Sequence, residues 1–228
     1  MRSSAACCLS LALACLAASP GWSETSEPPE HLTRVLERMA STPGVEASYV
    51  ERKEISLLVA PLDSRGVIYF VPPDRFARFT TEPGFSSLVV DGEGVRFREG
   101  RGGEEVDLSG SPMARGFVES FMVLWSGDRA ELSRLYELEL LGGSSDAEDW
   151  ALRLTPRHAP LSRMIGAIVL RGDGGGMRVM TVEEKDGDRT VTTFERVDSQ
   201  RRFAEPELRR LFESREPLVG AAGAATAP

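Results

Sequence analysis

Hydrophobic and polar positions along the chain follow two different periods. The segment PPEHLTRVLERMAST has apolar residues at Leu32, Val35, Leu36 and Met39. Spacings of three and four place these side chains on one stripe of a helix. Pro43 and Gly44, which follow shortly after, are a stop signal. The pattern therefore predicts an N-terminal amphipathic helix that ends near Ser41.

From Val45 onward the apolar period changes to two, which predicts β-strands. VEASYVERKEISLLVA alternates, and VIYFV follows a turn at residues 61–66 as an almost continuous apolar run. Pro72-Pro73-Asp74 then interrupts the pattern before RFARFTT resumes it. Because proline cannot donate to a strand ladder, this break must be a corner or an edge. SSLVV and VRFRE flank residues 91–94, DGEG, which is a hairpin signal.

The middle of the chain returns to helical spacing. SPMARGFVESFMVLWSGD begins with Ser111-Pro112, a helix start, and Gly127 provides a stop. Between them, Phe117, Phe121, Leu124 and Trp125 recur at helical intervals. Two interpretations stay open: a helix that packs on the sheet as core, or a lid over a cavity. Methionine and aromatic side chains would suit a surface that repacks around varied acyl chains.

The second half of the chain is again mainly of strand type. Segments from YELELL to TVTTFERVD alternate and are separated by Gly- and Asp-rich turns, and EPELRRLFES predicts a last helix. About ten strands joined by short turns predict an antiparallel sheet, curled into a barrel or half-barrel. No strand–helix–strand unit repeats, which argues against a parallel α/β sheet. The fold class is therefore mainly β, of the α+β type.

The first residues predict an export signal. Arg2 precedes an apolar run from Ala5 to Ala18, which is shorter than the about 20 residues of a membrane span. We place cleavage after Ser23, with Ala18 as the alternative. This divides the chain into a signal peptide (1–23), one domain (24–215) and a disordered tail rich in small residues (216–228). A lipid anchor at Cys15 is less favoured, because Ala12 stands three residues before it, where leucine is typical.

The composition argues against several kinds of site and partner. All three cysteines, Cys7, Cys8 and Cys15, lie in the signal peptide, so the mature chain has no disulfide and no thiolate site. An exported chain without cysteine fits the periplasm. The net charge of −8 argues against nucleic acid as the main partner, and also against electrostatic docking on anionic lipid.

The chain offers little chemistry for catalysis. The Gly-rich stretch at 171–177 precedes a strand rather than a helix, which favours a hairpin turn over a phosphate loop. His31 and His158 have no second histidine at ligand spacing, and no G-x-S-x-G motif is present. An esterase would need His158 as its base. We therefore expect no enzyme activity, no cofactor and no metal.

Taken in order, these segments resemble the LolA-type periplasmic carriers of outer-membrane lipoproteins, over about residues 30–213. VEASYVERKEI is similar to the family's F-x-A-x-F-x-Q strand, GVIYFVPPDRFARF to its proline corner, and LVVDGEGVRF to its D-G hairpin. The resemblance implies a strongly curved antiparallel sheet that forms an incomplete barrel, closed by the N-terminal helix and central lid helices. It also implies that the protein has no catalytic activity and binds no cofactor.

The resemblance further implies a periplasmic, monomeric carrier. It would bind the acyl chains of a lipoprotein or other lipid, accept them from an inner-membrane transporter and deliver them to an outer-membrane acceptor. The alternative is a half-barrel sensor or interaction module that binds a membrane protein; a second domain after the barrel would favour it. One difference concerns the lid, because Pro72 stands where the family often has an arginine that holds the lid.

The same resemblance implies two sets of site residues. The lipid cavity would be lined by Tyr49, Tyr69, Phe76, Phe79, Leu88, Val90, Phe97, Trp150 and Leu152. The lid would present Phe117, Phe121, Met122, Leu124 and Trp125. Arg75 and Arg78 are expected towards solvent or at the rim.

Overall fold

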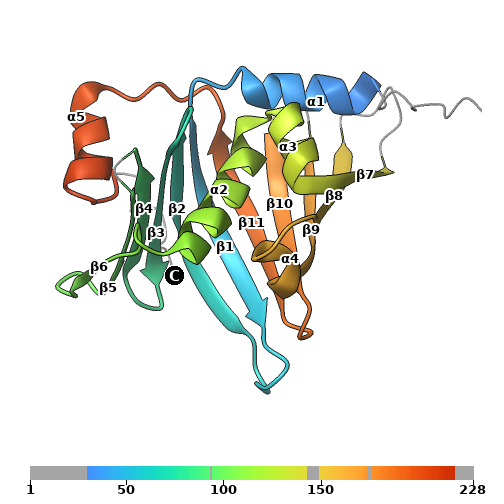
Figure 1. Ribbon diagram of the computed structural model, residues 1–228. Helices are drawn as coiled ribbons and strands as arrows, with labels where there is room; N and C mark the ends of the chain where they lie inside the picture. The colour runs from blue at the N-terminus through green and yellow to red at the C-terminus, as the bar shows by residue number, and fades with distance from the viewer. Residues whose placement is uncertain (1–29, 93, 143–148, 174–175, 219–228) are drawn as a thin grey trace, which may run out of the picture.

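The computed structural model describes residues 30–92, 94–142, 149–173 and 176–218 (Figure 1). The proposed signal peptide and its cysteines lie outside these ranges, as do residues 219–228 of the expected tail. None of the described helices is both long and apolar enough to cross a bilayer.

A single antiparallel sheet of eleven strands forms the body of the protein, against about ten expected. The strands are β1 (Val45–Glu54), β2 (Leu62–Val71), β3 (Arg75–Glu82), β4 (Ser86–Asp91), β5 (Gly94–Glu99), β6 (Glu105–Asp107), β7 (Tyr136–Gly142), β8 (Trp150–Pro156), β9 (Ile165–Asp173), β10 (Gly176–Glu184) and β11 (Arg189–Asp198). Their order is β6-β5-β4-β3-β2-β1-β11-β10-β9-β8-β7. The sheet curves strongly but does not close, so the expected incomplete barrel is confirmed (Figure 1).

The helices lie on both sides of this sheet. They are α1 (Glu30–Ala40), α2 (Pro112–Ser126), α3 (Arg129–Leu135), α4 (Leu161–Met164), α5 (Glu205–Leu208) and a following π-helical turn, η1 (Arg209–Glu213). Helix α2 crosses the concave face, whereas α5 lies on the opposite side (Figure 1). The main core joins the concave face to α1 and α2, and it includes Leu36, Leu124 and Phe194.

Short-range signals set the ends of the expected elements. Pro72–Asp74 form the turn between β2 and β3, as the proline break predicts. The Ser111 hydroxyl accepts a hydrogen bond from the Ala114 N–H at 3.2 Å, which caps α2. Gly127 ends α2 in the left-handed conformation, at φ 65°. A Cβ atom at this position would lie 2.5 Å from the Leu36 carbonyl oxygen, so Gly127 also lets α2 approach α1 closely.

A second core covers the convex face of β2, β3 and β4. There Tyr69, Phe79 and Val89 pack against Leu211 and Phe212 of η1. The chain stays in contact with the sheet beyond residue 215. The Arg98 Nη2 donates to the Glu216 carboxylate at 3.3 Å, and the Leu218 N–H donates to the Tyr69 hydroxyl at 3.2 Å. Packing therefore extends through the first three residues of the expected tail, to Leu218.

Candidate functional site: an apolar pocket under helix α2

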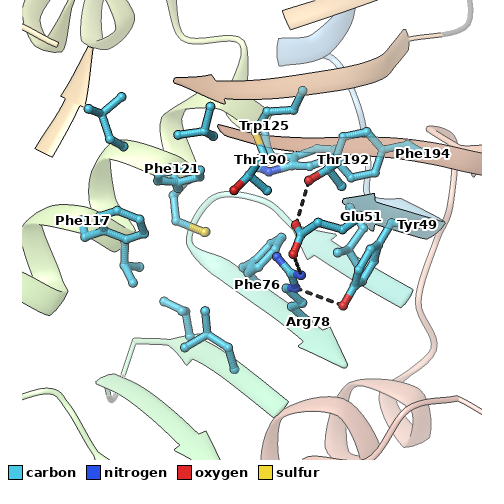
Figure 2. Close-up of a pocket in the computed structure, with 18 of the residues that line it drawn as sticks. Tyr49, Glu51, Phe76, Arg78, Phe117, Phe121, Trp125, Thr190, Thr192 and Phe194 are labelled. Carbon is cyan, nitrogen blue, oxygen red and sulfur yellow. Dashed lines mark hydrogen bonds and ion pairs between the residues drawn. The ribbon is translucent and has the colours of Figure 1, made fainter. Parts of the chain in front are cut away.

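A pocket of about 410 Å³ lies between the concave face of the sheet and α2 (Figure 2). This volume falls in the range of about 300–1,000 Å³ that is usual for ligand sites. Most of its lining is apolar: Ile68, Phe76, Leu88, Val90, Phe117, Val118, Phe121, Met122, Trp125, Met164, Ile165, Met180, Val182 and Phe194. The pocket is therefore suited to a hydrocarbon group.

Strand alternation decides which side chains reach the pocket. On β3, Phe76 and Arg78 face it, whereas Ala77 and Phe79 belong to the core of the convex face. The antiparallel register places Val90 opposite Phe76 and Leu88 opposite Arg78. Cross-strand partners share a face of the sheet, so all four of these side chains line one wall.

Helix α2 has two different halves. Val123, Leu124 and Trp125, near its C-terminal end, are buried in the main core. Met113 and Phe117, near its N-terminal end, are exposed by 60% and 37%. The C-terminal half is therefore core, whereas the N-terminal half partly covers the pocket and stays open to solvent. The core interpretation therefore applies to the C-terminal half, whereas a lid role for the N-terminal half stays a prediction.

Aromatic rings form the roof and one end of the pocket. Phe117 and Phe121 stack on each other one turn apart on α2, with ring centroids 4.6 Å apart (Figure 2). Trp125 meets Phe194 of β11 edge-to-face at 5.1 Å. Phe76 of β3 lies 6.4 Å from Trp125. These ring contacts join α2 to both halves of the curved sheet, and the Tyr136 hydroxyl of β7 also donates to the Ser120 carbonyl of α2 at 2.9 Å. Among the described residues, we find no ion pair between α2 and the strands.

One wall of the pocket carries charge. The Arg78 Nη2 donates to the Glu51 carboxylate at 2.7 Å, and the Arg78 Nε donates to the Tyr49 hydroxyl at 3.1 Å (Figure 2). The Thr192 hydroxyl donates to the other Glu51 oxygen at 2.8 Å. Further along β1, the Lys53 ammonium donates to Glu184 of β10 at 3.0 Å. Two ion pairs thus stand along one side of an otherwise apolar hollow.

These partners keep Glu51 and Arg78 charged despite their position. Burial disfavours ionisation of the Glu51 carboxyl, but the positive charge of Arg78 and the hydrogen bonds from Arg78 and Thr192 outweigh it. The pKa of Glu51 is therefore lowered. Burial likewise disfavours the charge on Arg78, yet interactions with Tyr49 and Glu51 raise the pKa of its guanidinium. The pair is neutral overall, with both members ionised at pH 7.

The structure brings some of the expected site residues together. The pocket lining includes these predicted positions: Tyr49, Phe76, Leu88, Val90, Phe117, Phe121, Met122 and Trp125. Leu124 and Leu152 are buried in the main core. Trp150 lines a separate, smaller hollow beside α1. Phe97 is half-buried opposite Leu88 on β5, outside the lining.

Tyr69 and Phe79 lie on the other side of the sheet, in the core of the convex face. The arginines were expected towards solvent or at the rim; the Arg78 side chain lines the pocket wall with Glu51 and is 29% exposed. Arg75 lies 5.7 Å from the ring of Phe212, on the convex side. The signal for Arg78 was present in the sequence, because it has the same strand parity as Phe76.

Other hollows and clusters suit a ligand less well. A wider hollow of about 660 Å³ runs beside α2 and α3, but Asp74, Arg115, Glu119 and Arg134 are among its lining residues. Glu184, Asp186 and Asp188 gather at the β10–β11 turn. There Glu184 already pairs with Lys53, and Asp188 accepts from Ser56. His158 is exposed between β8 and α4, and it does not line the pocket.

Known proteins extend this description. No curated protein matches the chain. Among solved structures, a DUF1329 family protein from Desulfovibrio piger is 11% identical, with a TM-score of 0.46, and the match covers 79% of this chain and 94% of that one. A LolA superfamily protein from Nitrosomonas europaea is 13% identical, with a TM-score of 0.42 and coverages of 77% and 94%. MucB, in the Pseudomonas aeruginosa MucA/MucB complex, is 19% identical, with a TM-score of 0.43 and coverages of 78% and 59%.

A family model gives the assignment. The model described as outer membrane lipoprotein carrier protein LolA-like matches residues 27–200, which include α1 and all eleven strands. This chain therefore belongs to the LolA-like family of outer membrane lipoprotein carrier proteins.

Proposed function

We propose that this protein is a periplasmic carrier of acyl chains. It binds the chains of a lipoprotein, or of another lipid, in the pocket under α2 and moves them from the inner to the outer membrane. Delivery then requires an inner-membrane transporter as donor and an outer-membrane acceptor. The observation that carries this proposal is the pocket itself, a hollow of about 410 Å³ with a mainly apolar lining.

The physical argument concerns both binding and release. Acyl chains in water cost about 0.8 kcal/mol for each exposed CH₂ group, so a carrier must bury them. It must also let them go without a chemical step. Apolar contacts between α2 and the strands are non-directional, and the half of α2 near Phe117 is already partly exposed. The N-terminal half of α2 can therefore move aside when an acyl chain binds and return when the chain leaves.

The test is native mass spectrometry of the protein recovered from the periplasm without detergent. We expect the mass of the processed chain plus that of a lipid or an acylated peptide. A bare protein mass that stays unchanged after incubation with lysophosphatidylcholine and with an acylated peptide would contradict the carrier. That result would favour an interaction module that uses the same fold to bind a membrane protein.

A further inference from the structure

The tip of the β1–β2 hairpin presents aliphatic side chains to solvent. Leu57 is 92% exposed and Val59 108%, while Leu58 and Leu62 are each about half exposed. These four residues are called here the apolar tip: three lie in the short connection between β1 and β2, and Leu62 is the first residue of β2. Full exposure of several neighbouring aliphatic residues is costly in water, and such patches usually mark a contact surface.

The apolar tip is held in place by its neighbours. The Ser56 N–H and hydroxyl both donate to the Asp188 carboxylate, at 2.9 and 3.1 Å. The Leu58 N–H donates to the Ile55 carbonyl at 2.9 Å, which closes a turn. Asp188 belongs to the β10–β11 turn, so the two hairpins support each other. The leucines are therefore presented by a fixed turn.

The tip lies at the same end of the molecule as one end of the pocket. Lys53 on β1, Glu184 on β10 and Thr190 on β11 line the pocket beside these two hairpin turns. Leu57 is only four residues beyond Lys53, which is at most about 13 Å along an extended chain. Figure 1 shows the hairpin projecting past the neighbouring strands at the lower end of the sheet.

Two observations indicate which class of partner contacts the apolar tip. Four aliphatic side chains on one turn fall well short of the about 800 Å² that each partner contributes to a stable protein interface. The charges around the tip, in residues 52–65 and 184–189, balance at five positive and five negative: Arg52, Lys53, Arg65, Lys185 and Arg189 against Glu54, Asp63, Glu184, Asp186 and Asp188. This surface offers no net charge to a charged protein or an anionic headgroup.

We propose that the apolar tip inserts into the surface of a lipid bilayer and holds the pocket against the membrane. The choice of a bilayer as partner rests on the proposed function, because the cargo of an acyl-chain pocket resides in membranes. Insertion places the pocket end beside Lys53 close to the headgroup layer. A chain then passes between bilayer and pocket with little exposure to water.

The test is flotation of the protein with phosphatidylcholine vesicles, which carry no net charge. We expect wild-type protein to float with the vesicles, and Leu57→Asp and Val59→Asp each to weaken this association at least tenfold. Val106→Asp is the matched control, because Val106 is also an exposed aliphatic residue, 49% exposed, but lies on the edge strand β6. All variants are recovered from the periplasm, as in the test of the proposed function, so that they carry the same processed N-terminus.

Several results would overturn the proposal. They are equal flotation of wild type and both tip variants, flotation that requires phosphatidylglycerol, or a tip variant that converts a dimer into a monomer. Uptake of lysophosphatidylcholine, followed by native mass spectrometry, tests the pocket separately. Tip variants that take up this lipid normally but fail to float support the proposal. Wild type that floats but takes up no lipid contradicts the carrier function and leaves the tip assignment standing.

Discussion

Arg78 and Glu51 form an ion pair, with 2.7 Å between Nη2 and Oε1, on the wall of a pocket whose other surfaces are mainly apolar. Neither side chain is deeply sealed, since 29% of Arg78 and 16% of Glu51 is exposed. Each nevertheless offsets part of the cost of placing the other's charge there. The pair joins β1 to β3 across β2, and Thr192 extends the network to β11.

Replacement of Arg78 by methionine should destabilise the protein, because the Glu51 carboxylate then remains on the pocket wall without its ion-pair partner. We expect Arg78→Met to lower the free energy of unfolding by about 2–3 kcal/mol, somewhat less than for a fully buried pair. Arg78→Met combined with Glu51→Met should recover most of this loss, since no lone charge is left. Urea unfolding of the two single variants and the double variant measures the coupling. A double variant as unstable as the sum of the singles would contradict it.

The ion pair also predicts a dependence on pH. Glu51 has a pKa below its ordinary value of 4.5 in the folded protein, so the unfolded chain binds its proton first as pH falls. The stability that this residue contributes is therefore full above about pH 5. It is lost as pH falls from about 4.5 through the lowered folded pKa.

Glu51→Gln is the variant that isolates this contribution. At pH 7 it should be less stable than wild type, and the difference should shrink as pH falls below about 4. Thermal unfolding at pH 7, 5, 4 and 3 checks the trend, with Glu104→Gln as the control at an exposed carboxylate. A difference between wild type and Glu51→Gln that is constant over this range would show that the charge is not responsible.

Phe121 on α2 tests the apolar lining directly. A carboxylate at this position would have to enter the pocket unpaired, so Phe121→Glu should weaken acyl-lipid binding at least tenfold, or about 1.4 kcal/mol. The measurement is titration with lysophosphatidylcholine, followed by the change in tryptophan fluorescence, to which Trp125 of the pocket lining contributes. Phe85→Glu makes the same chemical change on the convex side and should leave binding intact. If Phe121→Glu fails to fold, this part of α2 is core rather than roof.

Gly127 tests how α2 is anchored. Alanine would have to adopt φ 65° and would bring its Cβ within 2.6 Å of the Ala40 nitrogen on α1. Gly127→Ala should therefore lower the free energy of unfolding by more than about 1 kcal/mol. Gly110→Ala, near the other end of the same helix, meets no atom within 4 Å and should change stability little. Equal losses in the two variants would refute a specific anchor at Gly127.

Much of the fold was accessible from local signals. The period of two from Val45, the proline corner at Pro72 and the Ser111 and Gly127 ends of α2 each depend on a few neighbouring residues. The strong curvature of the sheet was predicted from the resemblance to the LolA-type carriers. The strand pairing then follows from short hairpin turns, except where β1 meets β11 across the length of the chain.

The pocket was harder to predict, because the sheet is covered on both faces. Alternation separates Phe76 from Phe79, but it does not say which face holds a ligand when both are apolar. The cover on the convex face comes from η1 and Leu218, more than 100 residues further along the chain. For the same reason, Tyr69 and Phe79 looked like cavity residues. Arg78 looked like a surface residue, since its partner Glu51 lies two strands away.

The open sheet has one more consequence. In a closed barrel, the number of strands and their stagger set the diameter. Here no ladder of hydrogen bonds joins the end strands β6 and β7 among the described residues, so the circumference is not fixed in that way. We therefore expect the β6 and β7 ends of the sheet to be able to move apart or together while every strand pair is retained. If the protein carries acyl chains as proposed, we expect a hollow of this kind to admit chains of different length and branching without the loss of a backbone hydrogen bond.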